Sequence, residues 1–165
     1  MKSLNAWIVI CCVGLAVGCT APNKTIHHDV TYDYDVNVDF SRFNSYNWVK
    51  LPATSRLDPF NQIRIKDAVN TQLEAKGLKV DIDKPDVYLV IYGGSYKAVD
   101  MAAMMDYKVY NVGRLKLAMY DAESHQEIWW AETRADLHEP LTPAQKDDVI
   151  AIAVQNILKY YPPRP

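Results

Sequence analysis

Apolar and polar residues alternate without a break from residue 30 to residue 40. Valine, tyrosine and phenylalanine occupy one face of this stretch, while threonine, aspartate and asparagine occupy the other. Because successive side chains of a β-strand point to opposite faces, the pattern predicts a strand with one buried and one solvated face. A shorter stretch, SYNWV at residues 45–49, predicts a second strand, which we expect to pair with the first.

Two helices are indicated by apolar residues that recur at helical spacing. The first helix begins at Asp58 and Pro59, a typical cap and first helical residue, and ends at Gly77. The second begins at a capping box formed by Thr142 and Gln145 and ends before two consecutive prolines. The recurring apolar residues are Ile65, Ala68, Val69 and Leu73 in the first helix, and Ile150, Ala153, Val154, Ile157, Leu158 and Tyr161 in the second.

Three further strands complete the pattern. The run VYLVIY at residues 87–92 is apolar throughout and predicts a strand that lies centrally or is covered on both faces. Residues 113–121 and 127–136 are separated by a polar turn and predict an antiparallel hairpin. The order of elements predicts a single α+β domain over residues 30–163, with an antiparallel or mixed sheet of about five strands and two helices packed on one face. The residues expected to share its core include Val36, Leu89, Leu117, Ile128, Val154 and Leu158.

The first residues of the chain have the features of an export signal. Lys2 gives a short basic start, and residues 6–17 form an uncharged, mostly apolar run of about twelve residues, a length that fits a secretory signal and is too short for a membrane-spanning helix. The run ends in LAVGC at Cys19, which resembles the bacterial lipobox. The resemblance implies that residues 1–18 are removed as a lipoprotein signal peptide and that Cys19 is acylated. Cys11 and Cys12 lack the small residue that a lipobox requires before the cleaved bond.

Acylation of Cys19 would attach the protein to a membrane through its fatty acyl chains, with residues 19–29 as a polar tether. Position 20 holds threonine rather than aspartate, which resembles lipoproteins sent to the outer membrane. We therefore expect a location in the bacterial cell envelope, at the outer membrane and facing the periplasm. The alternative is that all three cysteines are only small apolar residues of a signal.

Charge and length narrow the class of partner. The chain has 165 residues, with 18 basic and 20 acidic side chains, and a formal net charge of −2. Its basic residues are not clustered as phosphate binding requires, so we expect no nucleic acid partner. The length is that of one ordinary domain.

Four stretches together resemble one protein family. They are YDYDVNVDFSRFNSYNW, IRIKDAVNTQLEAKGL followed by KPDVYLVIYGG, VGRLKLAMYDAESHQEIWWAE, and the terminal AVQNILKYYPP. In this order they resemble the domain of unknown function 4136, a group of bacterial lipoproteins. The resemblance implies an exported, lipid-anchored α+β domain and carries over no catalytic residue.

Candidate metal and catalytic residues give weak signals. Asp33, Asp35, Asn37 and Asp39 have the alternate spacing of some calcium loops, but the glycine and glutamate that an EF-hand needs are missing. On a strand, these side chains are spread too far along the chain to hold one ion, and a solvated face explains them. The histidines lack metal-ligand spacing, and the serines lack a nucleophile motif. We therefore expect no metal, no cofactor and no catalytic residue.

Two features are candidates for binding a partner. Trp129 and Trp130 are neighbours on a predicted strand, so one should face the core while the other is available at the surface. Met101, Met104 and Met105 lie in an apolar connection at residues 98–110, and methionine suits adaptable binding surfaces. The alternative is that these methionines pack on the protein's own core.

The sequence therefore favours a non-enzymatic, lipid-anchored binding or assembly module of the envelope, with another envelope protein, a glycan or a lipid as its partner. The alternative is a cell-envelope hydrolase or transferase that uses carboxylates. Paired acidic residues with raised pKa in a cleft would favour the enzyme, and an apolar patch would favour the binding module.

Overall fold

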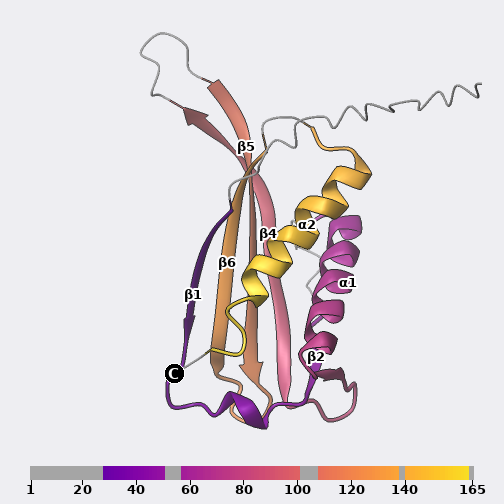
Figure 1. Ribbon diagram of the computed structural model, residues 1–165, viewed down its shortest axis with the longest axis vertical. Helices are drawn as coiled ribbons and strands as arrows, with labels where there is room; N and C mark the ends of the chain where they lie inside the picture. Colours follow the sequence, from indigo (N-terminus) through magenta and orange to yellow (C-terminus); the bar gives the residue numbers. More distant parts are fainter. Residues whose placement is uncertain (1–27, 51–56, 101–107, 138–139, 164–165) are drawn as a thin grey trace, which may run out of the picture.

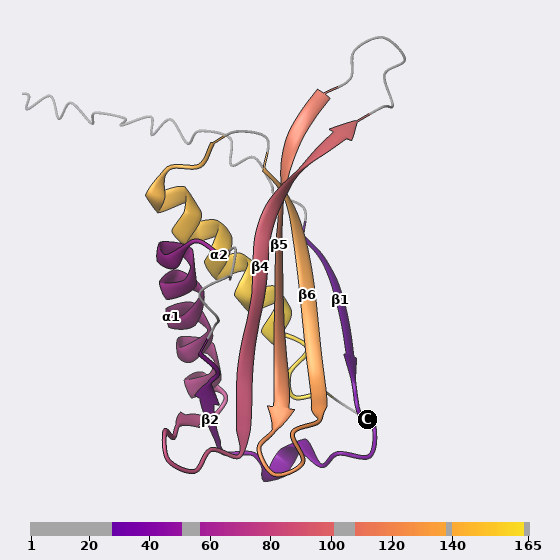
Figure 2. The same cartoon turned by 180° about the vertical axis from the view of Figure 1, so that it is seen from behind.

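The computed structural model describes residues 28–50, 57–100, 108–137 and 140–163. They form two layers, a twisted β-sheet and two helices that cover one of its faces (Figures 1 and 2). The elements are β1 (His28–Tyr34), a short 3-10 helix η1 (Phe40–Arg42), β2 (Ser45–Trp48), α1 (Pro59–Ala75), β3 (Lys79–Val80), β4 (Val87–Asp100), β5 (Lys108–Asp121), β6 (Glu127–Leu137) and α2 (Pro143–Leu158).

The six strands lie in the order β1-β6-β5-β4-β2-β3. The pairs β1–β6, β6–β5 and β5–β4 are antiparallel, whereas β2 runs parallel to both β4 and β3. The sheet is therefore mixed and has slightly more strands than the sequence pattern predicts. The expected α+β class is confirmed, and so is the packing of both helices on one face of the sheet (Figure 1).

The first strand is shorter than predicted and pairs elsewhere. Regular alternation continues to Phe40, but β1 ends at Tyr34 because Asp35 forms a turn: its carboxylate accepts the backbone N–H of Asn37 at 2.9 Å. Val36 is consequently 78% exposed, so its predicted place in the core is wrong. The predicted pairing of the first two strands is also wrong, because β1 lies beside β6 and β2 lies beside β4.

The central position predicted for the run at residues 87–92 is confirmed, because β4 lies between β5 and β2. Only one face of β4 is covered: Leu89 and Ile91 are buried under the helices, while Tyr92 is 48% exposed on the other face. β4 continues past the two glycines at 93 and 94 and stays in register with β5 as far as Asp100.

Both helices begin as their sequence signals predict. The Asp58 carboxylate accepts the backbone N–H of Asn61 at 3.0 Å, and Thr142 and Gln145 form the reciprocal capping box. Gly77 follows α1 with a φ of +92°, a left-handed conformation that favours glycine. Both helices start at the end of the sheet from which the β4–β5 hairpin projects (Figures 1 and 2). No helix in the described part of the chain is long and apolar enough to cross a membrane.

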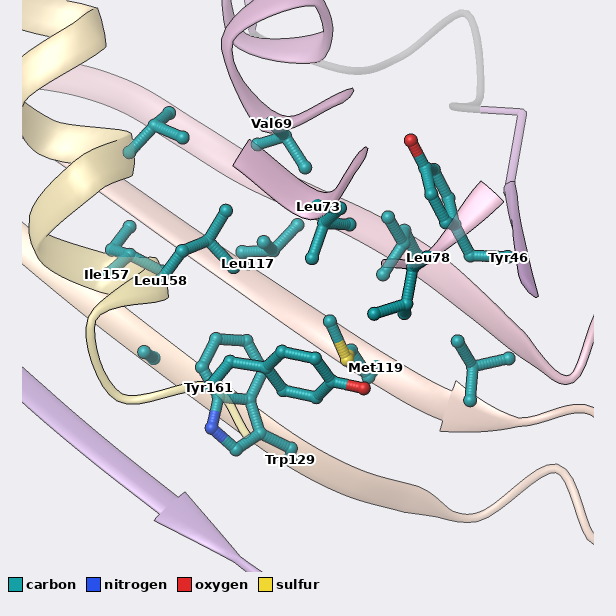
Figure 3. Close-up of a cluster of buried hydrophobic side chains, with 14 of the residues drawn as sticks. Tyr46, Val69, Leu73, Leu78, Leu117, Met119, Trp129, Ile157, Leu158 and Tyr161 are labelled. Atoms are coloured by element: carbon teal, nitrogen blue, oxygen red, sulfur yellow. The ribbon is translucent and has the colours of Figure 1, made fainter. Parts of the chain in front are cut away.

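The core lies between the helices and the sheet (Figure 3). Trp129 and Tyr161 lie against each other there, with ring centres 5.5 Å apart. The Trp129 indole N–H also donates to the Tyr160 carbonyl at 3.1 Å. The predicted core members other than Val36 are buried in this cluster: Leu89, Leu117, Ile128, Val154 and Leu158.

Candidate ligand groove

The helix-facing side of the sheet changes in character along its length. Strands β4, β5 and β6 align in successive rungs of three residues, one from each strand. The rung Leu89–Met119–Trp129 is fully buried and consists of large side chains. Counted along the helix-facing side toward the projecting hairpin, the third rung after this one is Ser95–Gly113–Ala135. We call these regions the closed end and the open end of the sheet.

Small residues at the open end leave space between the sheet and the helices. A groove of about 360 Å³ lies there, a volume at the lower limit of typical small-molecule sites. Ser95, Gly113 and Ala135 form part of its floor. Its apolar walls and floor are completed by Leu57, Ile65, Leu115, Leu137, Leu141, Val149, Ile150 and Ala153. The groove therefore has an aliphatic lining drawn from both layers of the fold.

One polar atom in this lining is unsatisfied. Thr133 lies on β6, opposite Leu115, and is only 2% exposed. Its hydroxyl oxygen Oγ1 is the one buried side-chain oxygen or nitrogen without a hydrogen-bond partner among the described residues. Leaving a buried hydroxyl unpaired costs about 1–3 kcal/mol, so native proteins do so rarely. Thr133 is also one of the residues that line the groove.

Polar residues border the groove where the two helices begin. Asp58 and Asn61 contribute from the start of α1, and Lys146 contributes from the first turn of α2. An ion pair between Arg64 and Asp147 joins the early turns of the two helices. Lys146 forms no ion pair with any residue that the structure describes.

The same end of the molecule carries exposed apolar residues. Phe60 is 71% exposed and Ile63 is 58% exposed, and both lie in the first two turns of α1. Two large apolar side chains so close to a groove opening favour contact with an apolar surface or partner.

The two tryptophans lie on opposite faces of β6, as their adjacent positions predict. Trp129 is the one that faces the core, where it is fully buried, which leaves Trp130 as the candidate for binding a partner. Trp130 lies on the outer face of the sheet, where Lys116 Nζ is 4.6 Å from its ring centre. Lys116 also lies 5.8 Å from the ring centre of Tyr92 and 3.4 Å from a carboxylate oxygen of Glu127. Trp130 is thus half-buried within a cluster of neighbouring side chains.

An ion-pair cluster lies beside Trp130 on the same outer face. The Glu132 carboxylate pairs with both Arg114 and Arg134. Burial opposes ionisation of Glu132, but the hydrogen bonds from the two arginines hold the pKa of this carboxyl below its ordinary value. Nearby, the Tyr92 hydroxyl, burial and Glu127 together raise the pKa of the Tyr120 hydroxyl. The charged side chains of this cluster thus pair with one another.

The carboxylates at the closed end serve to fix turns. Asp86 accepts the backbone N–H groups of Asn44 and Ser45 at 2.8 and 2.9 Å, and the Asn44 bond leads the effects that lower its pKa. Asp121 accepts the backbone N–H of Ser124 at 2.7 Å, and this bond likewise lowers its pKa. Arg42 pairs with Asp121. Lowered pKa values describe carboxylates held ionised for structure, unlike the raised pKa of a general acid.

The acidic positions near the start of the domain have separate local roles. Asp33 lies on the outer face of β1, opposite Trp130, and Asp35 forms the turn that ends the strand. Asp39 caps η1 by accepting the backbone N–H of Ser41 at 3.0 Å, and its hydrogen bonds with Ser41 lower its pKa. No group of three or more potential metal ligands gathers in the described part of the chain.

The remaining candidates lie outside the described residues. These are the three candidate methionines, Met101, Met104 and Met105, and the proposed lipidation site, Cys19. The strands on either side, β4 and β5, extend into the predicted connection at residues 98–110, to Asp100 and from Lys108.

Sequence reasoning did not identify the groove. The alternation that places Leu115, Leu117 and Met119 on the helix-facing side of β5 also assigns Gly113 to that side. This loss of side-chain volume is visible in the sequence, but it gains meaning only when Ala135 and Ser95 are known to lie beside it. The signal was therefore present but needed the strand register to be interpreted.

Comparison with known proteins identifies the fold and the family. A PDZ domain protein from Parabacteroides distasonis superposes with a TM-score of 0.62 at 15% identity; the match covers 85% of this chain but only 37% of that protein. Two crystal forms of the PelC dodecamer from Paraburkholderia phytofirmans, one of them a single-residue variant, give TM-scores of 0.54 and 0.52. Their identities are 10% and 11%, and the matches cover 80% and 84% of this chain and 95% and 100% of PelC.

At these identities the structural likenesses establish the fold alone. A search of curated protein sequences found no match. The family model for the domain of unknown function DUF4136 matches residues 30–163, the whole described domain apart from its first two residues. The chain therefore belongs to the DUF4136 family.

Proposed function

We propose that this protein is an exported, lipid-anchored component of the bacterial cell envelope that acts as a non-enzymatic binding module. The groove at the open end is its ligand site. The anchor is Cys19, the cysteine that ends the signal-like run in the sequence, and the expected location is the outer membrane, facing the periplasm.

The observation that carries this proposal is the unpartnered hydroxyl of Thr133 in the lining of the groove. Packing defects in proteins are usually filled, and buried polar groups are usually paired. The groove and the unpaired hydroxyl of Thr133 depart from both tendencies at one place, between the sheet and the first turns of the two helices. Such departures concentrate where structure is organised for binding rather than for stability.

The alternative function, an envelope hydrolase or transferase that uses carboxylates, requires an acidic group suited to proton transfer. Among the described residues, the four carboxyl groups with a shifted pKa, Asp39, Asp86, Asp121 and Glu132, are all shifted downward. Asp58 is the one acidic residue in the groove lining, and its carboxylate caps α1. These features support the binding module over the enzyme.

Export and anchoring are tested by replacing Cys19. The Cys19→Ser variant should lack the acyl modification and should no longer sediment with membranes in a processed form, while Cys11→Ser should behave as the wild type. Mass spectrometry of the N-terminal peptide and membrane fractionation measure both properties. A cleaved, membrane-retained Cys19→Ser protein would overturn the proposed anchor.

Ligand binding is tested by blocking the groove. Ser95 is exposed and lines the groove, so Ser95→Trp should fill the groove without disturbing the core. Thr31 is an exposed residue on the outer face of β1, opposite Glu132, and Thr31→Trp is the matched control. The full chain, extracted in polymer-bounded membrane discs, should carry a non-covalent small molecule in native mass spectrometry. Ser95→Trp should lose that molecule and Thr31→Trp should keep it; wild type without any bound molecule would overturn the proposal.

A further inference from the structure

The open end of the sheet is also the end from which the N-terminal tether leaves. His28, the first residue of β1, pairs with Ala135, which pairs with Gly113, which pairs with Ser95. The chain therefore enters the sheet in the same row that forms the groove floor. Cys19 precedes His28 by nine residues, and nine extended residues span at most about 30 Å. A protein anchored at Cys19 thus keeps the groove within a short distance of the membrane.

Two exposed apolar residues also lie at this end of the molecule. Phe60 and Ile63 lie in the first two turns of α1, whose start borders the groove, and are 71% and 58% exposed. Large apolar side chains at the end nearest an anchor are suited to contact with the lipid surface. In that orientation, the end of the domain that holds the groove faces the lipid surface.

The lining of the groove selects among ligand classes. Its apolar residues are leucine, isoleucine, valine, alanine and proline, and none of the described lining residues is aromatic. Planar ligands such as nucleobases are held by stacking on aromatic rings, which this groove does not offer. Flexible aliphatic chains need only apolar contact. A volume of about 360 Å³ suits one such chain better than two.

Two of the polar groups in the lining match features of a lipid head group. The Thr133 hydroxyl can donate one hydrogen bond to a carbonyl oxygen. Lys146, at the groove border, offers a positive charge that is not paired with a described residue. An acyl ester with a phosphate-bearing head group has both complementary features.

These observations extend the proposed function, on which they rest. We propose that the groove takes up one acyl chain of a membrane phospholipid, with the Thr133 hydroxyl donating to the ester carbonyl and Lys146 facing the phosphate. The lipid comes from the leaflet in which Cys19 is anchored. The protein then binds lipid at two places, covalently at Cys19 and reversibly in the groove.

The test is photo-crosslinking in cells that produce the full chain. The cells are grown with a fatty acid bearing a diazirine and an alkyne, which enters their phospholipids, and are then irradiated. Phospholipid adducts should map to peptides containing Leu137 and Val149, two residues of the groove lining. Ser95→Trp should lose these adducts, and Thr31→Trp should keep them.

A separate variant tests the role of the Thr133 hydroxyl. Thr133→Val keeps the shape of the side chain and removes one hydrogen bond, so the adduct yield in the groove should fall about threefold to tenfold. Thr31→Val should leave the yield unchanged.

Other outcomes overturn the inference in distinguishable ways. A groove peptide crosslinked to the N-terminal peptide means that the protein's own Cys19 acyl chain occupies the groove. A bound molecule in native mass spectrometry without acyl adducts in the groove means that the ligand belongs to another class, and the proposed binding function stands. Absence of both a bound molecule and adducts overturns the inference together with the proposed function.

Discussion

The closed and open ends of the sheet are built from the same three strands but are filled differently. At the closed end, Trp129 packs on Tyr161 and its indole N–H donates to the Tyr160 carbonyl. At the open end, Gly113 and Ala135 leave a groove, and Thr133 keeps an unpaired hydroxyl. One core is thus closely packed at one end and open at the other, and in the function that we propose the closed end provides stability while the open end binds the ligand.

The largest expected effect is at the closed end. Trp129→Ala removes a fully buried ring together with its hydrogen bond to the Tyr160 carbonyl, so the free energy of unfolding should fall by about 3–5 kcal/mol. Trp130→Ala, on the outer face, removes a contact with Lys116 and should cost about 1 kcal/mol. Urea unfolding of both variants measures the difference. Equal losses would mean that the core is not concentrated on the helix-facing side.

The second expected effect is a loss of stability at low pH that comes from carboxylates at the closed end. Asp86 and Asp121 fix turns at the closed end, and each has a pKa below its ordinary value. The unfolded state therefore binds protons more readily, so these groups stabilise the fold fully above the unfolded pKa of about 3.9 and lose that contribution as pH falls through their folded values. Stability should drop below about pH 4, and Asp121→Asn should flatten the drop. Urea midpoints from pH 7 to pH 3 measure this, and an unchanged slope in Asp121→Asn would contradict it.

The smallest expected effect is a gain in stability rather than a loss. Thr133→Val replaces an unpaired buried hydroxyl with a methyl group of similar shape, so it should stabilise the ligand-free protein by about 1 kcal/mol and raise its melting temperature by about 3–5 °C. Thr31→Val, at an exposed position, should change stability by less than about 0.5 kcal/mol. Differential scanning calorimetry compares them. A loss of stability in Thr133→Val would show that its hydroxyl is paired in the free protein.

The sequence predicts those elements whose signals are local. The cap at Asp58, the capping box at Thr142 and the hairpin of β5 and β6 depend on neighbouring residues and are all confirmed. The alternation beyond Tyr34 wrongly predicts that the strand continues. The side chain of Asp35 accepts a backbone N–H in a turn there, and this turn competes with pairing in the sheet.

The features that sequence reasoning missed depend on which strands are neighbours. The parallel pairing of β2 with β4 follows from the crossover through α1, which periodicity does not specify. The groove likewise needs Gly113 and Ala135 side by side under two helix starts. Neither residue has a signal of its own, because glycine and alanine in a strand are ordinary when taken singly.

The most direct test of the central claim is to locate lipid within the folded domain. Methyl NMR of the deuterated full chain in discs of protonated phospholipid detects acyl methylene protons close to individual methyl groups. The account predicts lipid NOEs at Leu115 and Leu141 in the groove, and none at Leu89 and Leu158 in the closed end. Lipid NOEs confined to exposed residues such as Ile63, with none at Leu115, would contradict it.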